Sequence, residues 1–501
     1  MQILNNKSKN TYIYCFILFL YVLLVFIVGF HHEPWPDEAQ SWLIARDHSY
    51  ADIFFVQTRY EGHPFIWYFI EKGLIDFCSL FTSSSNAYNW IFILPLAFSA
   101  LGIYLFLFRS KFPLWFKIVF PFTFYTFYQY GIISRSHALY FPVIAAIASL
   151  YPKRFEHPFV YALFLFICAN ISAYSFVVSF VLLIFFFIEA FLNRKTLNLK
   201  KLLFPSSVLL LCLIFIAVLM QKPTDTTVQI ELILYKEKLL AALHNIAEIY
   251  FPIRNSGLKQ ILLGNLFVLV FYLSVMKAYC KNLYQTIFFL CLNLPLFALY
   301  IILYIQPWHY GYAIYTLLFC CWIFTGINDI KSIPVKNNFI LYACIIFILI
   351  HQTVGNIIVS WYDINNNYGV SKVTADLIKK YNLQDYKING LGFKSVGVQP
   401  YFEKNIYYNY KGATHFFWEK EFADNYQLLS REKTPIIIVD STNCPEVYSE
   451  EFLKSIEDDY YIYYLSAESN GLNFKYGSRE DNSYHFYIDK NLAQKIGLEA
   501  P

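Results

Sequence analysis

The chain has 501 residues, of which 57% are hydrophobic and only 15% are charged, with a formal net charge of +4. Soluble domains average roughly 45–50% apolar and 25% charged residues, so this composition excludes a set of ordinary soluble domains and indicates an integral membrane protein. The small net charge comes from short clusters between apolar runs, and no motif that reads RNA or DNA is present, so no nucleic-acid partner is expected.

Apolar runs long enough to cross ~30 Å of hydrocarbon as helices recur through the first 360 residues. The first run is followed by no small-residue cleavage site, so a retained helix is expected there and not a cleaved signal peptide. The runs predict an α-helical polytopic membrane protein with about eleven membrane-spanning helices. The expected spans are residues 11–30, 88–108, 114–133, 138–151, 158–173, 175–192, 203–220, 261–276, 284–305, 311–327 and 339–360.

Basic residues predict the orientation of these spans, because short cytoplasmic loops carry an excess of Lys and Arg. A cytoplasmic N-terminus places most basic clusters inside, and the odd number of spans then places the C-terminal region outside. The clusters that fall inside are Lys7 and Lys9; Arg109, Lys111 and Lys117; Lys153 and Arg154; Arg194, Lys195, Lys200 and Lys201; Lys277 and Lys281; and Lys331 and Lys336.

Two segments on the expected outer side, residues 31–87 and 221–259, are longer than simple turns. Within them, residues 31–46, 60–80 and 231–249 mix aromatic and polar side chains. This mixture predicts amphipathic helices that lie along the membrane interface. Spans and outer loops together are expected to form one membrane domain over residues 1–360.

After the last span the composition becomes polar, and residues 361–501 are expected to form an extracytoplasmic α/β domain. A glycine-containing run at residues 390–397, GLGFKSVG, is similar to a dinucleotide-binding loop. Its third glycine comes two positions late, so no nucleotide cofactor is expected. The expected elements are strands at 435–440, 460–465 and 484–488 and helices at 370–381 and 449–456.

The first chemically notable stretch is residues 31–47, HHEPWPDEAQSWLIARD, directly after the first span. Asp37 and Glu38 follow Pro36, so they occupy the first turn of a helix that begins there. One interpretation is that the two carboxylates only complement the helix dipole. The other is that one of them is catalytic.

A second stretch on the same expected face is residues 59–68, RYEGHPFIWY. It offers Arg59, Glu61 and His63 beside a glycine and a proline that shape the local backbone.

Two further stretches place basic side chains at expected outer turns. Residues 128–139, YQYGIISRSHAL, carry Arg135 and His137, which could either extend toward the headgroups or bind a lipid-linked phosphate. Residues 306–312, QPWHYGY, carry His309; a lone histidine at such a position is more often an ordinary interface residue than a catalytic one.

Together these side chains suit the transfer of a sugar from a lipid phosphate. A carboxylate would accept the proton of the acceptor hydroxyl, and basic groups would hold the departing phosphate. The catalytic candidates are Asp37, Glu38 and Glu61, and the candidates for binding the donor phosphate or sugar are Arg59, His63, Arg135, His137 and His309.

These motifs resemble the GT-C class of polytopic glycosyltransferases, which includes protein mannosyltransferases and bacterial aminoarabinose transferases. Members carry an acidic motif, often Asp-Glu, in the first non-cytoplasmic loop and a His-Pro segment, and the matching positions here are Asp37-Glu38, Glu61 and His63-Pro64.

More closely, EPWPDEAQSWLIARD, RYEGHPFIWY, YGIISRSHAL, HYGY and the later VGVQPYFEKNIYYN resemble a set of bacterial membrane proteins of this class. The similarity covers residues 31–140 well and 306–312 weakly. It implies a GT-C membrane fold, Asp37 as the catalytic base, and location in a bacterial inner (plasma) membrane.

The chain departs from the family pattern after the histidine, where the family often has two prolines and Phe65 follows Pro64 here. Some relatives bind a metal ion near the second acidic residue. Glu61, His63 and His309 have suitable ligand chemistry, so a divalent metal is a further hypothesis, although their spacing is not diagnostic.

The leading expectation is an inverting glycosyltransferase that moves a sugar from a polyprenyl-phosphate donor to a hydroxyl of a lipid, glycan or protein acceptor. One alternative is a lipid or glycan transporter or flippase, which predicts ionisable residues at mid-membrane. The spans offer little of this, since Glu189 is near the inner end of its helix and His351 is isolated. The other alternative is a non-catalytic assembly protein whose outer domain binds a partner.

Overall fold

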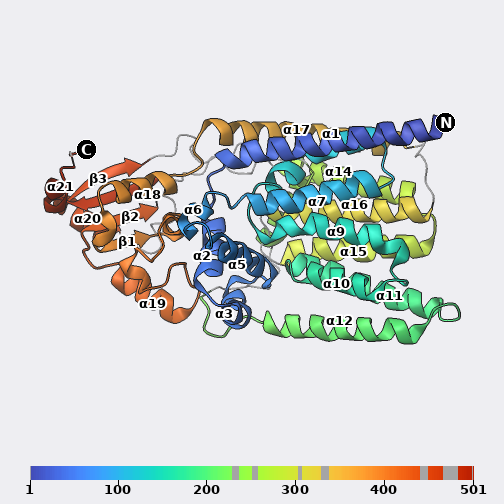
Figure 1. The fold of residues 1–501 in the computed structure, drawn as a ribbon, viewed down its shortest axis with the longest axis horizontal. Coiled ribbons are helices and arrows are strands. Elements are labelled where there is room, and N and C mark those ends of the chain that lie inside the picture. Colours follow the sequence, from blue (N-terminus) through green and yellow to red (C-terminus); the bar gives the residue numbers. More distant parts are fainter. Residues whose placement is uncertain are drawn as a thin grey trace. The chain divides into compact units, whose positions relative to one another are not determined.

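The structure is a computed structural model. It describes residues 2–227, 236–250, 258–302, 307–328, 338–440, 450–465, 483–498 and 500–501. The chain divides into two compact units, and the ribbon is shown in Figure 1. Unit 1 comprises Met1–Ile27, Ile93–Met220 and Ile230–Ile358, and unit 2 comprises Val28–Phe92, Gln221–Gln229 and Val359–Pro501.

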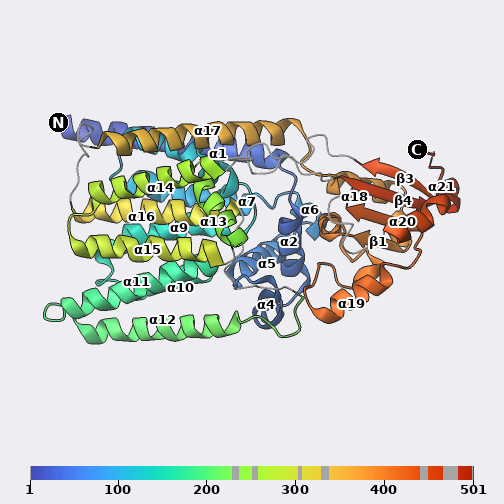
Figure 2. The ribbon, with the colours of Figure 1, turned by 180° about the vertical axis from the view of Figure 1, so that it is seen from behind.

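Unit 1 is helical, and in both Figure 1 and Figure 2 its long helices lie side by side along a common direction. Two of them, α1 (Gln2–His31) and α17 (Phe339–Asn365), continue into unit 2. The other helices are α7 (Ile93–Arg109), α8 (Leu114–Val119), α9 (Tyr140–Leu150), α10 (Pro158–Ala169), α11 (Ala173–Leu192), α12 (Leu199–Leu219), α13 (Lys236–Glu248), α14 (Leu258–Tyr279), α15 (Leu283–Ile302) and α16 (Tyr310–Ile327).

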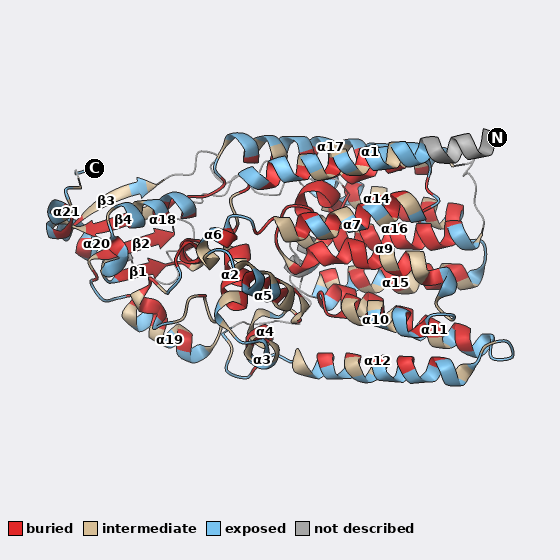
Figure 3. Ribbon diagram, in the orientation of Figure 1, coloured by how far each residue is buried: buried red, intermediate tan, exposed pale blue. Residues whose placement is uncertain are grey.

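Seven described helices are long and apolar enough to cross a membrane, which fits a multi-pass membrane protein. The central helix is α16, of which 83% is buried, against 28–44% of the other six. In Figure 3 α9 and α16 are mostly buried, whereas α12 carries exposed residues along its length. The seven segments are Asn10–His31, Ala173–Leu192, Leu199–Leu219, Leu258–Tyr279, Leu283–Ile302, Tyr310–Ile327 and Phe339–Asn365.

The expected count of about eleven spans is not confirmed. The expected span at 114–133 is no continuous helix: α8 ends at Val119 and is followed by a 3₁₀ turn, Phe120–Phe122, and a π-helical turn, Tyr125–Gln129. Pro121 lies at this break and lacks the backbone N–H that a continuous helix needs. A hydropathy profile does not record this missing hydrogen-bond donor. The expected span at 138–151 contains only the eleven residues of α9, and the apolar helices α7 and α10 are also shorter than 18 residues.

Unit 2 combines short helices with a four-stranded sheet of order β1-β2-β4-β3. Strand β1 is parallel to β2, with Ile388 opposite Ile436, while β4 is antiparallel to both β2 and β3. The strands are β1 (Ile388–Leu391), β2 (Ile436–Asp440), β3 (Tyr460–Leu465) and β4 (Tyr484–Asp489). The α-helices of this unit are α2 (Pro36–Asp47), α3 (Tyr50–Asp52), α4 (Thr58–Glu61), α5 (Ile66–Cys78), α6 (Ser84–Tyr88), α18 (Ser371–Lys380), α19 (Lys420–Leu429), α20 (Glu450–Ile456) and α21 (Lys490–Ile496).

One hydrophobic core joins the first loop to the C-terminal sheet. Trp42 and Leu43 of α2 pack in the same cluster as Ile436 and Ile438 of β2. Helix α2 is therefore buried from Glu38 to Ala45, which corrects the expectation of an interfacial helix over residues 31–46. The cores thus group residues 28–92 with residues 359–501.

The glycines of residues 390–397 are required by close packing. A Cβ atom at Gly390 would lie 2.7 Å from the Tyr407 ring, and one at Gly397 would lie 2.5 Å from the Ser371 hydroxyl. Gly392 has a φ of +88°, which other residues rarely adopt.

Candidate functional site

The helix that carries the acidic pair begins where the sequence predicts. Trp35 has extended backbone angles and Pro36 is the first residue of α2, where its fixed φ favours a helical start. Asp37 and Glu38 therefore lie in the first turn, where a negative charge is stabilised by the helix dipole.

The two adjacent carboxylates differ sharply in their surroundings. Glu38 is 0% exposed, accepts the backbone N–H of Trp35 at 2.9 Å, and lies 3.0 Å from Nε2 of His32. Asp37 is partly exposed. This difference favours Asp37 over Glu38 as the group that meets a substrate.

His32 lies between two carboxylates. Its Nδ1 is 3.0 Å from Asp363 in the last turn of α17, and its Nε2 is 3.0 Å from Glu38. Burial alone would lower the pKa of His32. The charges of Glu38 and Asp363 and the hydrogen bonds to them outweigh burial, and they raise this pKa to about 10. His32 is therefore a cation at neutral pH.

Glu61, from the second motif, is brought beside α2 by Gln40. Asp37 and Gln40 are three residues apart and so share a face of the helix. Gln40 Nε2 donates to Glu61 Oε1 at 2.8 Å and to the carbonyl oxygen of Phe416 at 2.6 Å, while Gln40 Oε1 accepts the N–H of Phe416 at 3.0 Å. The structure thus unites the first two motifs on one side of α2.

Arg59 and His63 flank Glu61 in the chain. Arg59 lies in α4, which ends at Glu61 and is capped by Gly62, where φ is +69° and the backbone is left-handed. Both Arg59 and His63 are half-buried in unit 2.

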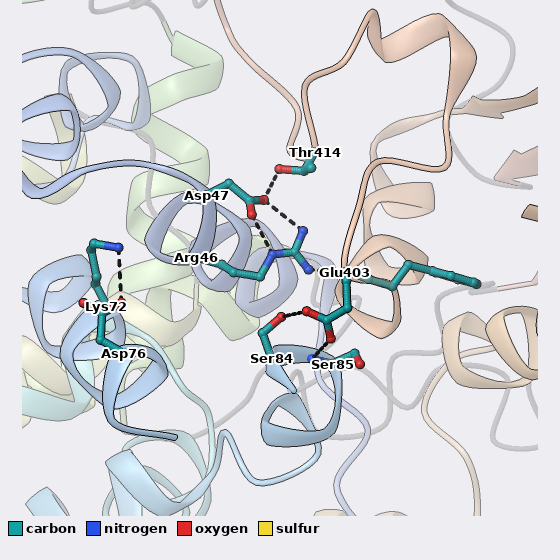
Figure 4. A network of polar contacts seen from close by, with 9 residues as sticks. Arg46, Asp47, Lys72, Asp76, Ser84, Ser85, Glu403 and Thr414 are labelled. Atoms are coloured by element: carbon teal, nitrogen blue, oxygen red, sulfur yellow. Dashed lines mark hydrogen bonds and ion pairs between the residues drawn. The ribbon is translucent and has the colours of Figure 1, made fainter. Parts of the chain in front are cut away.

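The C-terminal end of α2 is also held. Figure 4 shows Arg46 paired with Asp47, which in turn accepts a hydrogen bond from Thr414. Arg46 Nη1 also donates to the carbonyl oxygen of Phe402 at 2.6 Å. In the same view Glu403 binds two serines of α6 at 2.7 and 2.8 Å. Hydrogen bonds at both ends therefore fix α2 within unit 2.

The third and fourth motifs meet in unit 1, around Tyr130. Its hydroxyl donates to the carbonyl oxygen of Trp308 at 3.0 Å, and its ring lies 4.7 Å from the ring of His137. A Cβ atom at Gly311 would lie 2.4 Å from the Tyr130 ring, so only glycine permits this approach. His309 follows Trp308 directly in the chain.

Other side chains line the same region of unit 1. His309 lies 4.9 Å, ring to ring, from Tyr174. His137 Nε2 is 3.0 Å from the carbonyl oxygen of Gln129, and Arg135 is half-buried.

Sequence reasoning missed several polar residues near these motifs. In α13, Glu248 accepts a hydrogen bond from Tyr310 at 3.1 Å and pairs with His244 at 3.1 Å. The i,i+4 spacing of His244 and Glu248 was a usable signal within the segment interpreted as interfacial. His32 and Asp363 were also missed, because Asp363 lies beyond the expected span 339–360 and the contact joins residues 331 positions apart.

The three residues with suitable chemistry for a metal ion are divided between the two units. Glu61 and His63 belong to unit 2 and His309 to unit 1. Across the described ranges, no group of three or more His, Cys, Asp or Glu side chains is arranged to hold a metal ion.

Unit 1 also contains an apolar cavity of about 200 Å³ among α14, α16, α17 and the segment around α8. Its walls include Phe116, Phe271, Leu317 and Leu349, and Lys111 is the one charged residue in its lining.

Comparisons with protein-family models, with curated proteins and with solved structures find no match to this chain.

Proposed function

We propose that the protein is an inverting glycosyltransferase of the GT-C type, which moves a sugar from a polyprenyl-phosphate donor to an acceptor hydroxyl on the non-cytoplasmic face of a bacterial inner membrane. The observation that carries this proposal is the environment of Asp37. Asp37 is partly exposed on a helix that is buried from Glu38 to Ala45 and is hydrogen-bonded at both ends, and Gln40 holds a second carboxylate, Glu61, on the same side.

In this reaction the acceptor oxygen attacks the anomeric carbon while Asp37 takes the hydroxyl proton. The bond between the anomeric carbon and the phosphate oxygen breaks, and the electron pair leaves with the polyprenyl phosphate. Attack opposite the leaving group inverts the anomeric configuration. A base on a fixed helix suits this role, because the orientation of the reacting groups is a large part of the rate enhancement.

Basic groups would stabilise the phosphate as its charge grows. In unit 2, Arg59 and His63, which flank Glu61 in the chain, would supply them. A phosphate leaves readily as an anion, so no second carboxylic acid is required. The apolar cavity lined by Phe271, Leu317 and other side chains of the membrane helices suits part of an isoprenoid chain.

The transporter alternative receives less support from the helices of unit 1. Glu189 accepts hydrogen bonds from Arg154 Nε at 3.0 Å and from Tyr284 at 2.6 Å, which is a locked structural pair and not an open path.

The test is a transfer assay with purified protein in lipid nanodiscs. Radiolabelled polyprenyl phosphates that carry glucose, mannose, galactose or arabinose serve as donors, with envelope lipids and glycans as acceptors. We expect one donor to be consumed with release of polyprenyl phosphate, and Asp37→Asn to abolish this release while the protein stays folded. Turnover of no donor, or full activity of Asp37→Asn, would contradict the proposal.

A further inference from the structure

Two cavities open next to each other on the surface of unit 2. The first has a volume of about 690 Å³ and lies beside the starts of β2 and β3 and the end of β4. The second has a volume of about 600 Å³ and lies beside the start of β1. Tyr386 lines both cavities, so they adjoin at its side chain, and we call the pair the Tyr386 groove. Its other walls include Lys433, Asp459 and Lys495 in the first cavity and Lys387, Tyr408 and Lys411 in the second.

Tyr386 is held in place by its backbone and by the core of unit 2. It follows the 3₁₀ turn Leu383–Asp385, and its N–H donates to the carbonyl oxygen of Leu383 at 3.0 Å. Its side chain packs against the hydrophobic core that contains Ile436, yet the residue is only half-buried. Strand β1 begins two residues later. Tyr386 therefore offers the groove an aromatic side chain whose position is set by the sheet.

The wall of the second cavity has unusual backbone geometry. Lys411 has a φ of +50° and is followed by Gly412 at +93°. Among the residues that the structure describes, Asn382 is the only other non-glycine residue with a positive φ. Side chains other than glycine rarely adopt this conformation, and it is concentrated at binding sites and other functional segments. Lys411 Nζ donates to Asn425 Oδ1 at 3.2 Å, so the turn gives Lys411 a defined place in the lining.

Two tyrosine rings of the groove have a lysine beside them. Lys495 Nζ lies 5.9 Å from the centre of the Tyr386 ring, and Lys387 Nζ lies 4.1 Å from the centre of the Tyr408 ring. Carboxylates line the groove as well, among them Asp459. The groove therefore combines flat apolar surfaces with hydrogen-bond donors and acceptors.

This lining argues against several classes of ligand. Five lysines and four aspartates line the groove, so it lacks the strong positive field that binds a nucleic acid or an anionic membrane surface. Charged walls also disfavour a lipid chain, since burying charges against hydrocarbon is costly.

A sugar fits the same lining. The apolar face of a sugar ring can pack on a tyrosine ring, and its hydroxyl groups both donate and accept hydrogen bonds, as lysine donors and aspartate acceptors require. Each cavity lies within the range of about 300–1,000 Å³ that is usual for small-ligand sites, so the pair has room for more than one sugar unit.

We propose that the Tyr386 groove binds an oligosaccharide, with one sugar ring against Tyr386, another against Tyr408, and hydroxyl groups hydrogen-bonded to the neighbouring lysines and aspartates. Sugar binding at this groove requires neither Asp37 nor a donor. That the bound sugar belongs to the acceptor rests on the function proposed above, and it makes that acceptor a glycan.

The test measures binding of labelled hexasaccharides of glucose, mannose, galactose or N-acetylglucosamine to the full chain in lipid nanodiscs, without any donor. We expect the wild-type protein to bind one of them. Loss of one aromatic contact should weaken this binding by about 2- to 10-fold in Tyr386→Ala and in Tyr408→Ala. Tyr386→Phe keeps the ring and should bind within about twofold of wild type. Tyr464→Ala, at a residue of β3 that is 56% exposed and outside the lining, is the matched control.

A second readout needs no substitution. Hydroxyl-radical labelling of the wild-type protein, followed by mass spectrometry, measures how accessible each tyrosine is. The bound hexasaccharide should protect Tyr386 and Tyr408 from oxidation and leave Tyr464 labelled as before. If Tyr386→Ala does not fold, Tyr408→Ala and this protection carry the test.

Binding of no hexasaccharide would overturn the proposal. So would binding that Tyr386→Ala and Tyr408→Ala leave unchanged, or protection of both tyrosines by a mixture of random octapeptides and by no sugar.

Failure of this inference and failure of the proposed function are distinguishable. Asp37→Asn should bind the hexasaccharide as tightly as wild type, and sugar binding without turnover of any donor would remove the proposed function and leave the groove. Donor turnover without hexasaccharide binding would remove the groove alone. With turnover, Tyr386→Ala should raise KM for the glycan acceptor by about 2- to 10-fold at unchanged kcat. A fall in kcat at unchanged KM would contradict a role of the groove in holding the acceptor.

Discussion

Trp42 offers a direct test of the shared core of unit 2. Its indole is 0% exposed and lies 5.6 Å, ring to ring, from Tyr88, in the cluster that includes strand β2. Truncating a buried tryptophan to alanine costs about 3–5 kcal/mol. The indole N–H has no hydrogen-bond partner among the described residues. Removing this buried donor stabilises the folded state by about 1 kcal/mol and offsets part of the loss. We therefore expect Trp42→Ala to destabilise unit 2 by about 3 kcal/mol.

The assay is hydrogen exchange followed by mass spectrometry. Because the core is shared, protection of β1 and β2 should fall by about 100-fold although Trp42 lies in the first loop. Trp322→Ala, at a residue 6% exposed in unit 1, is the control and should leave both strands protected. Unchanged protection of β1 and β2 in Trp42→Ala, with loss confined to α2, would refute the shared core.

Three further changes test local features of unit 2. Glu33→Gln removes the carboxylate that accepts N–H groups at the start of α18, at 2.9 and 3.2 Å, so α18 should lose about 1 kcal/mol and exchange faster. Gly392→Ala combines a φ of +88° with a Cβ 2.7 Å from Asp440, and should lower the thermal midpoint more than Gly62→Ala, whose Cβ meets nothing within 4 Å. Burial, and then the charge of His48, lower the pKa of His415 to about 3, below the value of about 6.5 in the unfolded chain. The folded state then binds fewer protons than the unfolded chain, so the free energy of unfolding should fall as the pH drops from about 6.5 toward 3. In thermal unfolding curves, His415→Asn should make this dependence on pH weaker. An unchanged dependence on pH would contradict the burial of a neutral His415.

The sequence predicts the elements of this fold where local pattern and final structure agree. Strands β2, β3 and β4 and helices α18 and α20 lie within two residues of their expected positions, because their apolar periodicity is carried by the segments themselves. Strand β1 was not predicted, because Asn389 and Gly390 have low strand propensity. It is held by pairing with β2 and by the hydrogen bond from Gly390 N–H to Asn409.

The membrane spans were also predicted only as far as local sequence pattern determines them. Hydropathy identifies long apolar helices but does not register a missing backbone donor, so the break at Pro121 was not predicted. The burial of α2 could not be predicted from its own sequence either, because it depends on contacts with residues of the C-terminal sheet.

In the candidate site, residue types were predictable but their surroundings were not. Asp37 and Glu38 are equivalent in sequence, and what separates them is His32 and, through it, Asp363, a residue 331 positions away from His32. Gln40 lies three residues after Asp37 and joins Glu61 to α2, yet a glutamine in a helix carries no signal of its own. The first two motifs lie together in unit 2, and the third and fourth lie together in unit 1.

The measurement that tests the central claim most directly is single-turnover sugar transfer by Asp37→Asn and Glu38→Gln, compared at equal amounts of folded protein. If Asp37 is the base, Asp37→Asn should lose about 10²–10⁴-fold in rate. Glu38→Gln should lose less than about tenfold, because its carboxylate acts only through the helix. Equal losses in the two variants, or a larger loss in Glu38→Gln, would contradict the assignment of Asp37 as the group that takes the acceptor proton.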